Sequence, residues 1–212
     1  MPKHLTVEQQ QRYARDGFVA PIDIFTADEI TDIRAEIEAA ESRWPNALDG
    51  AGRNNGHLAL PVLDRIIHDS RILDAVEDVI GGDILVAGST LFIKEPSSGG
   101  FISWHQDARY AGMEPHDWVT GWVAISNVTE ENGCMRMIPG SHIDPLRDHV
   151  DTFGEDNLLT RSVPGVGSMM KFGKKVANKA VPGLDETFER RIKAWLSDSL
   201  PGLITRSEQF LQ

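Results

Sequence analysis

The short run His105-Gln106-Asp107 contains two side chains that could hold a metal ion. Residues two apart on a β-strand point to the same side, so the imidazole of His105 and the carboxylate of Asp107 could meet at one cation. With a second histidine they would form the two-histidine, one-carboxylate triad that holds Fe(II) in non-heme oxygenases. The spacing therefore predicts two ligands of a metal site that needs a third.

No motif identifies the third ligand. A second His-x-Asp pair, His142-Ile143-Asp144, follows the turn residues Pro139-Gly140, so its side chains need not converge. No histidine follows His149 in the chain. The candidates that stay open are His142, His149 and two acids of the C-terminal tail, Asp185 and Glu186.

Composition and charge restrict the class of protein. A chain of 212 residues can form one domain with a sizeable core. Its net charge of -11 disfavours nucleic acid and anionic membranes as partners, because charges of this sign repel phosphate. The single Cys134 excludes an internal disulfide and a cysteine-based zinc site. Because there is no signal peptide and no long apolar run, the expected compartment is the cytoplasm.

Three helices are predicted within residues 1–82, each from a capping residue followed by apolar residues at helical spacing. They are expected to start at Thr6, Thr26 and Ser70, and the first and third to end at Gly17 and Gly81. The stretch 49–56, rich in glycine and asparagine, is predicted to be a surface loop.

Short strands separated by turn residues are predicted over residues 83–161. The segments with strand character are 84–93, 101–107, 118–125 and 134–138. Helices followed by short strands indicate a β-sandwich or jelly roll with a helical flank. The remaining residues, 162–212, are expected to form an atypical tail of the same domain, with an amphipathic helix at about 185–200.

Taken together, these motifs resemble the phytanoyl-CoA dioxygenase family over about residues 5–161. The matching stretches are Tyr13, 16–18, 91–96, 104–107, 119–125 and 132–142, in that order. The resemblance implies an α+β protein built on a double-stranded β-helix, the jelly roll or cupin-like fold, with an N-terminal helical flank and a C-terminal helix. It also implies Fe(II), 2-oxoglutarate as cosubstrate, O2, and a small organic or acyl substrate.

The same resemblance assigns roles to individual residues. His105 and Asp107 match the first two iron ligands of the family. Trp122 and Leu91 match residues that line the 2-oxoglutarate pocket, and His57 lies near the place of a polar residue close to the cosubstrate. Trp122 could equally be a buried strand residue, because tryptophan is common in cores.

Beyond about residue 162 the sequence departs from the family pattern. The distal histidine that completes the triad has no match, and neither does the arginine that binds the far carboxylate of 2-oxoglutarate. The jelly roll would then be incomplete on its C-terminal side. Three functions stay open. The first is an active dioxygenase, and the second is a jelly-roll protein that binds a small acid or a partner without turnover. The third is a zinc- or sugar-binding module of the cupin type. The sequence does not set the oligomeric state.

Overall fold

The computed structural model describes residues 1–45, 48, 50–94, 101–111, 118–143, 145–151 and 161–162. The chain divides into two compact units, and each unit is assembled from segments that are distant in sequence. The first unit comprises residues 1–10, 22–96 and 118–128, and the second comprises 11–21, 97–117 and 129–212. The helix expected at about 185–200 lies outside the described residues. The division of one domain at residues 82 and 161 remains a prediction.

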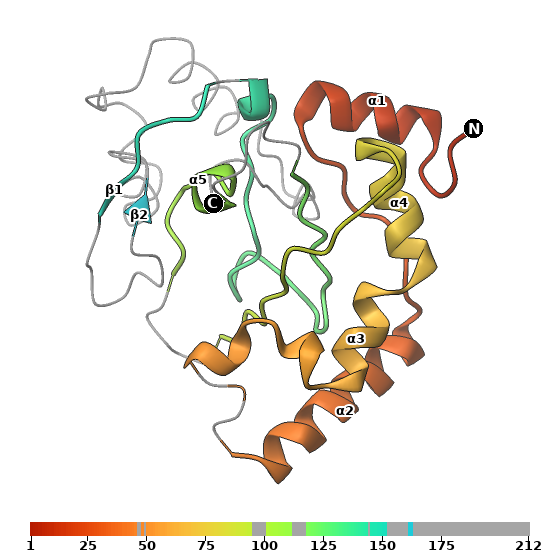
Figure 1. Cartoon of the computed structure of the whole chain (residues 1–212), viewed down its shortest axis with the longest axis vertical. Helices are drawn as coiled ribbons and strands as arrows, with labels where there is room; N and C mark the ends of the chain where they lie inside the picture. Colours follow the sequence, from red (N-terminus) through yellow and green to blue (C-terminus); the bar gives the residue numbers. More distant parts are fainter. Residues whose placement is uncertain are drawn as a thin grey trace. The chain divides into compact units, whose positions relative to one another are not determined.

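Helices dominate the described part of the chain (Figure 1). The α-helices are α1 (Val7–Asp16), α2 (Ala27–Arg43), α3 (Pro61–Ile67), α4 (Ser70–Ile80) and α5 (Ala108–Ala111). The 3-10 helices are η1 (Gly50–Arg53), η2 (Gly56–Leu58) and η3 (Ser141–Ile143). The three helices predicted within residues 1–82 are thus confirmed as α1, α2 and α4. None of these described helices is long and apolar enough to cross a bilayer.

Side-chain caps explain where the helices begin. The Thr26 hydroxyl accepts a hydrogen bond from the Glu29 backbone N–H at 3.2 Å, and the Glu29 carboxylate accepts one from the Thr26 N–H at 2.7 Å. Thr6 and Gln9 form the same reciprocal pair before α1. Each pair satisfies two backbone donors that a helix start would otherwise leave exposed. At α4 the cap is Asp69, one residue before the predicted start.

The sequence did not predict α3, and the loop expected over 49–56 contains the one-turn helix η1 and the start of η2. Pro61 is the first residue of α3, where its fixed φ favours a helix and its missing N–H costs nothing. The helix is too short for its apolar residues to show a helical period. It contacts α2, α4 and η2 (Figure 1), so it holds the helices of the first unit together.

An apolar core lies among these helices in the first unit. Its buried members are Ile33, Ile37, Leu48, Val62 and Leu63. Leu91, Ile93 and Ile125 pack against this cluster, although none of the three belongs to an assigned strand. The alternation of apolar residues in these segments therefore indicates which side chains face the core, and it does not indicate that the segments form strands.

The strands predicted over 84–93, 101–107, 118–125 and 134–138 were wrong as assignments. The strands among the described residues are β1 (Val150–Asp151) and β2 (Arg161–Ser162), which pair antiparallel with Val150 opposite Ser162. Alternation favours an extended chain, but a strand also needs backbone hydrogen bonds to a neighbour. Besides the β1–β2 pair, backbone pairing in the described part of the chain is limited to isolated bridge residues, such as the bridge between Asn54 and Thr90. The jelly roll is therefore not shown.

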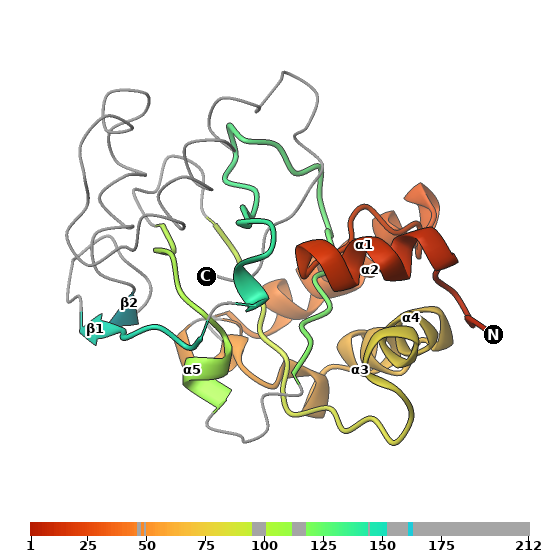
Figure 2. The same ribbon diagram turned by 90° about the horizontal axis from the view of Figure 1, so that it is seen from above.

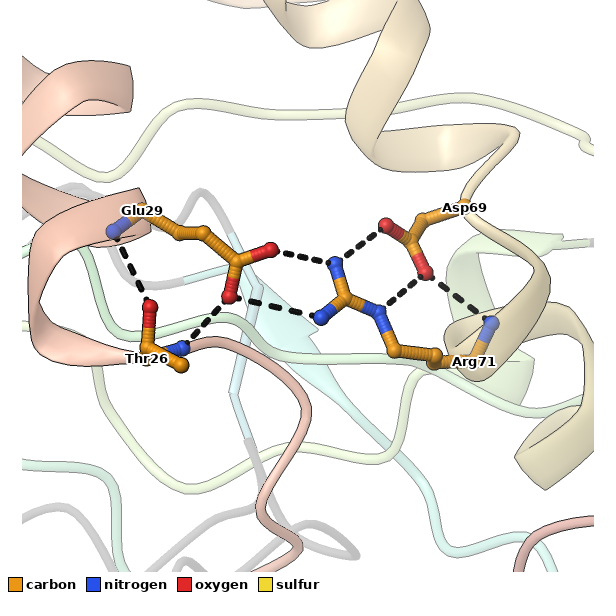
Figure 3. Close-up of polar contacts among 4 residues, drawn as sticks. All are labelled: Thr26, Glu29, Asp69 and Arg71. Carbon is orange, nitrogen blue, oxygen red and sulfur yellow. Dashed lines mark hydrogen bonds and ion pairs between the residues drawn. The ribbon is translucent and has the colours of Figure 1, made fainter.

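Arg71 joins the N-termini of α2 and α4 (Figure 3). Its guanidinium donates to both Glu29 oxygens, at 2.9 and 3.3 Å, and to both Asp69 oxygens, at 2.7 and 2.9 Å. It also lies 4.8 Å from the ring centroid of Phe25, a cation–π contact. The hydrogen bonds from Arg71, followed by the capping N–H of Thr26, lower the pKa of Glu29 to about 2.

We expect the stabilising contribution of Glu29 to disappear in acid. Its folded pKa of about 2 lies below the usual 4.5, so the charged carboxylate stabilises the folded chain above pH 4.5. This contribution is lost as the pH falls through 2. Urea midpoints of the wild type and Glu29→Gln should therefore differ at about pH 6 and converge near pH 2. Asp28→Asn, which removes a charge from the same helical turn, is the control. A difference that stays constant with pH would contradict the prediction.

Candidate metal site

His105 and Asp107 lie in the second unit, on a bent segment that leads into α5. The carbonyl of Gln106 accepts from the Arg109 N–H at 3.0 Å, and that of Asp107 accepts from Tyr110 at 2.9 Å. Because turn hydrogen bonds use these carbonyls, the segment does not continue as the predicted strand. The two side chains still meet: Nε2 of His105 lies 3.4 Å from Oδ1 of Asp107.

The environment of His105 suits a metal ligand. The residue is 2% exposed, and its Nδ1–H donates to the Ser103 carbonyl at 2.9 Å. This hydrogen bond places the ring's lone pair on Nε2, the nitrogen beside Asp107. Burial lowers the pKa of His105 to about 2, and the neighbouring His149 acts in the same direction, so the ring is neutral at physiological pH.

A neutral imidazole beside a carboxylate is a donor set that fits Fe(II). A lone pair on Nε2 and a negative oxygen at 3.4 Å repel one another unless a cation or a proton lies between them. The Asp107 side chain is 29% exposed, so the carboxylate end of the pair can be reached from solvent. The two residues could therefore provide two of the three ligands of such a triad, and the pair is open to solvent on the side of Asp107.

His149 lies close to this pair, but both of its ring nitrogens are already used. Nε2 accepts from the Gln106 backbone N–H at 2.9 Å, and Nδ1–H donates to the Arg147 carbonyl at 2.8 Å. The Tyr110 ring makes T-shaped contacts with both imidazoles, with centroids 5.5 Å from His105 and 6.2 Å from His149. His149 could bind a metal only by giving up the hydrogen bond from Gln106.

His142, the other histidine left open as a ligand, closes the end of a helix instead. It lies in η3, and its Nε2–H donates to the Ala14 carbonyl of α1 at 3.1 Å. The Gly140 N–H donates to the Asp16 carbonyl at 2.7 Å. Figures 1 and 2 show η3, in teal, beside the end of α1. These contacts satisfy carbonyls that a helix end leaves open, so His142 has a structural role.

Within the ranges that the structure describes, no three histidine, cysteine, aspartate or glutamate side chains are arranged to hold one metal ion. The other residues left open at the sequence level, Asp185 and Glu186, lie outside those ranges, and so do Asp144 and His116. Among the described residues, the structure thus brings His105 and Asp107 together and identifies no third candidate ligand beside them.

The residues expected to line a cosubstrate pocket lie in the first unit. Leu91 packs against the apolar core, and Trp122 is half-buried. His57 is also half-buried, and its Nδ1 is hydrogen-bonded to the Ser89 hydroxyl at 2.6 Å. The Asn55 N–H donates to the Ser89 carbonyl at 2.7 Å, so the chain around His57 lies beside the segment that leads to Leu91. The sequence did not predict Ser89 as the partner of His57, because no motif around Ser89 indicates a contact with a residue 32 positions away.

The chain is similar to proteins of one known family. A family model described as phytanoyl-CoA dioxygenase matches residues 13–179, a match that continues beyond residue 161. A probable alpha-ketoglutarate-dependent hypophosphite dioxygenase of Stutzerimonas stutzeri is 26% identical over 177 residues, which are 73% of this chain and 60% of the relative.

Two further relatives have similar identities. An ectoine dioxygenase of Bordetella parapertussis is 28% identical over 166 residues, which are 71% of this chain and 53% of the relative. A peroxisomal phytanoyl-CoA dioxygenase of Rattus norvegicus is 27% identical over 168 residues, which are 68% of this chain and 50% of the relative. The chain thus spans between 50% and 60% of the length of these three relatives.

Proposed function

Because the chain belongs to the phytanoyl-CoA dioxygenase family, we propose that it is an Fe(II)- and 2-oxoglutarate-dependent dioxygenase that hydroxylates a small organic or acyl substrate. The observation that carries the proposal is the contact between His105 Nε2 and Asp107 Oδ1 at 3.4 Å. The double-stranded β-helix of the family is part of the same proposal. The relatives are named for hypophosphite, ectoine and phytanoyl-CoA, so the substrate is proposed only as a class.

In this proposal His105 and Asp107 hold the iron. When bound, Fe(II) and 2-oxoglutarate supply the oxidation: one oxygen atom of O2 enters the product, and the other enters succinate as CO2 is released. The chain's own contribution is to keep His105 neutral and in one tautomer through burial and the Ser103 carbonyl. The buried run 103–106 shields the imidazole from water, and the partly exposed side chain of Asp107 leaves its carboxylate in contact with solvent.

The cosubstrate pocket is assigned by resemblance to Trp122, Leu91 and His57. Trp122 and Leu91 would supply apolar walls. The hydrogen-bonded His57 and Ser89 pair could donate a hydrogen bond to a carboxylate, and Ser89 lies two residues before Leu91 in the chain.

A second function stays in view, that of a family member that binds a small acid without turning it over. Two observations favour it. No histidine follows His149 in the chain, and no three-ligand group occurs among the residues with a described structure. A site with two protein ligands would leave more positions on the ion to water.

Conversion of 2-oxoglutarate to succinate, with no other substrate added, distinguishes the two functions. The purified chain is mixed anaerobically with Fe(II) and 2-oxoglutarate, and the visible spectrum is searched for the weak charge-transfer band expected when 2-oxoglutarate chelates iron. Air is then admitted and succinate is measured. We expect both the band and succinate formation that depends on 2-oxoglutarate. A band without succinate would indicate a binding protein, and neither signal from a folded chain would refute the dioxygenase.

A further inference from the structure

We propose that His149 is a positioning residue, which fixes the His105–Asp107 pair through Gln106 and does not bind the metal itself. This inference rests on the proposed role of His105 and Asp107 as ligands. It follows from how the segment 147–149 holds the one residue that lies between them.

Gln106 is held at two points by that segment. Its backbone N–H donates to Nε2 of His149 at 2.9 Å, and its side-chain Oε1 accepts from the Arg147 N–H at 2.7 Å. Gln106 and His149 are 7% and 8% exposed, so water competes little for these hydrogen bonds. The residue between the two proposed ligands is therefore fixed through both its backbone and its side chain.

His149 is itself held in one orientation. Its Nδ1–H donates to the Arg147 carbonyl at 2.8 Å, which fixes the tautomer and leaves Nε2 as an acceptor for Gln106. The next residue, Val150, begins β1, which pairs with β2. The strand pair, His149 and Gln106 thus form a continuous connection to the proposed metal ligands.

Holding the backbone at Gln106 matters because the two ligands flank it. A rotation of the peptide at Gln106 would move His105 and Asp107 in opposite directions and open the 3.4 Å contact between Nε2 and Oδ1. Groups that orient metal ligands in this way typically change metal affinity by about 10- to 100-fold when they are removed. The hydrogen bond to Nε2 should have an effect of this size.

Two substitutions of His149 separate a positioning role from ligation. His149→Phe keeps a ring beside Tyr110 but removes the acceptor, whereas His149→Gln loses the ring but keeps an acceptor near the position of Nε2. Fe(II) affinity is measured anaerobically on the full chain, and hydrogen exchange of the Gln106 amide is measured without metal. The same two substitutions at His68, an exposed histidine at the end of α3, are the matched controls.

We expect His149→Phe to weaken Fe(II) binding about 10- to 100-fold and His149→Gln to stay within about threefold of the wild type. The Gln106 amide should lose its protection from exchange in the Phe variant alone. If the Phe variant is unfolded by circular dichroism, Gln106→Leu replaces it. This variant removes the contact with Arg147, and about a tenfold loss is expected.

The inference is overturned if His149→Phe (or its replacement, Gln106→Leu) binds Fe(II) as tightly as the wild type. It is also overturned if the Phe and Gln variants lose affinity equally, since the imidazole would then be a ligand. If His149→Phe binds Fe(II) as tightly as the wild type while His105→Ala does not bind it, only the role of His149 has failed and the proposed function stands. If the wild type binds no Fe(II), the proposed function and this inference fall together.

Discussion

His105→Ala and Asp107→Ala are each expected to weaken Fe(II) binding by at least about 100-fold and to remove succinate formation. Loss of a group that only orients a ligand costs up to about 100-fold, so loss of a ligand should cost no less. Affinity is measured by anaerobic titration and succinate by its release in air. Because Asp107 is partly exposed, its replacement should change stability little. His105 is buried and bonded to Ser103, so its truncation should also cost about 1–3 kcal/mol of stability.

The chain offers a matched control for this experiment. Asp64 and His68 form another histidine–carboxylate contact, at 3.2 Å, with both side chains more than half exposed. Alanine at either position should leave Fe(II) affinity and succinate formation unchanged. If these variants lose metal to the same extent as those at 105 and 107, the binding is nonspecific. If the variants at 105 and 107 unfold, and Fe(II) does not change the stability of the wild type, His105 and Asp107 stabilise the fold and do not bind the metal.

Gly17→Ala is expected to destabilise the chain by about 2–4 kcal/mol, measured by urea denaturation. Gly17 ends α1 with φ of +86°, a conformation that costs other residues about 1–2 kcal/mol. A Cβ at this position would also overlap the ring of His142. Backbone strain and the overlap should therefore add.

A double-mutant cycle separates the two costs. In a His142→Ala background the overlap with the ring is gone and only a 3.0 Å contact with the Cβ of residue 142 remains, so Gly17→Ala should cost less, about 1–2 kcal/mol. His142→Ala alone should cost about 1 kcal/mol for the lost hydrogen bond to the Ala14 carbonyl. Equal costs of Gly17→Ala in both backgrounds would show that the ring does not restrict position 17.

The two His-x-Asp pairs of the chain illustrate how context assigns a role. His105 is buried, and its lone pair lies beside a carboxylate. His142 occupies the same place in its own motif, but its Nε2–H is bonded to the end of α1. The spacing alone could not distinguish them, whereas the turn residues before His142 correctly indicated a different backbone.

Local signals in the sequence were sufficient for the helical region. The reciprocal hydrogen bonds of Thr6 with Gln9 and of Thr26 with Glu29 join residues three positions apart, so a short window of sequence contains both partners. Gly17 at the end of α1 and Gly81 at the end of α4 are also local signals. Each adopts a positive φ, which glycine tolerates because it has no side chain, so no distant partner is needed. For this reason α1, α2 and α4 could be read from the residues. The contact of His105 with Asp107 was also expected, but from a strand geometry that the segment does not adopt.

The strands and the role of each histidine depended on partners far along the chain. Gln106 and His149 are 43 positions apart, and Ala14 and His142 are 128 apart. A periodic pattern shows which side of a segment is apolar, but it does not say whether another segment will supply a backbone ladder. Likewise, residue type makes every histidine a possible ligand. The three-dimensional contacts show which ring nitrogens are already hydrogen-bonded, to the Ser103 carbonyl in His105, to Gln106 and Arg147 in His149 and to Ala14 in His142, and so narrow the roles each histidine can have.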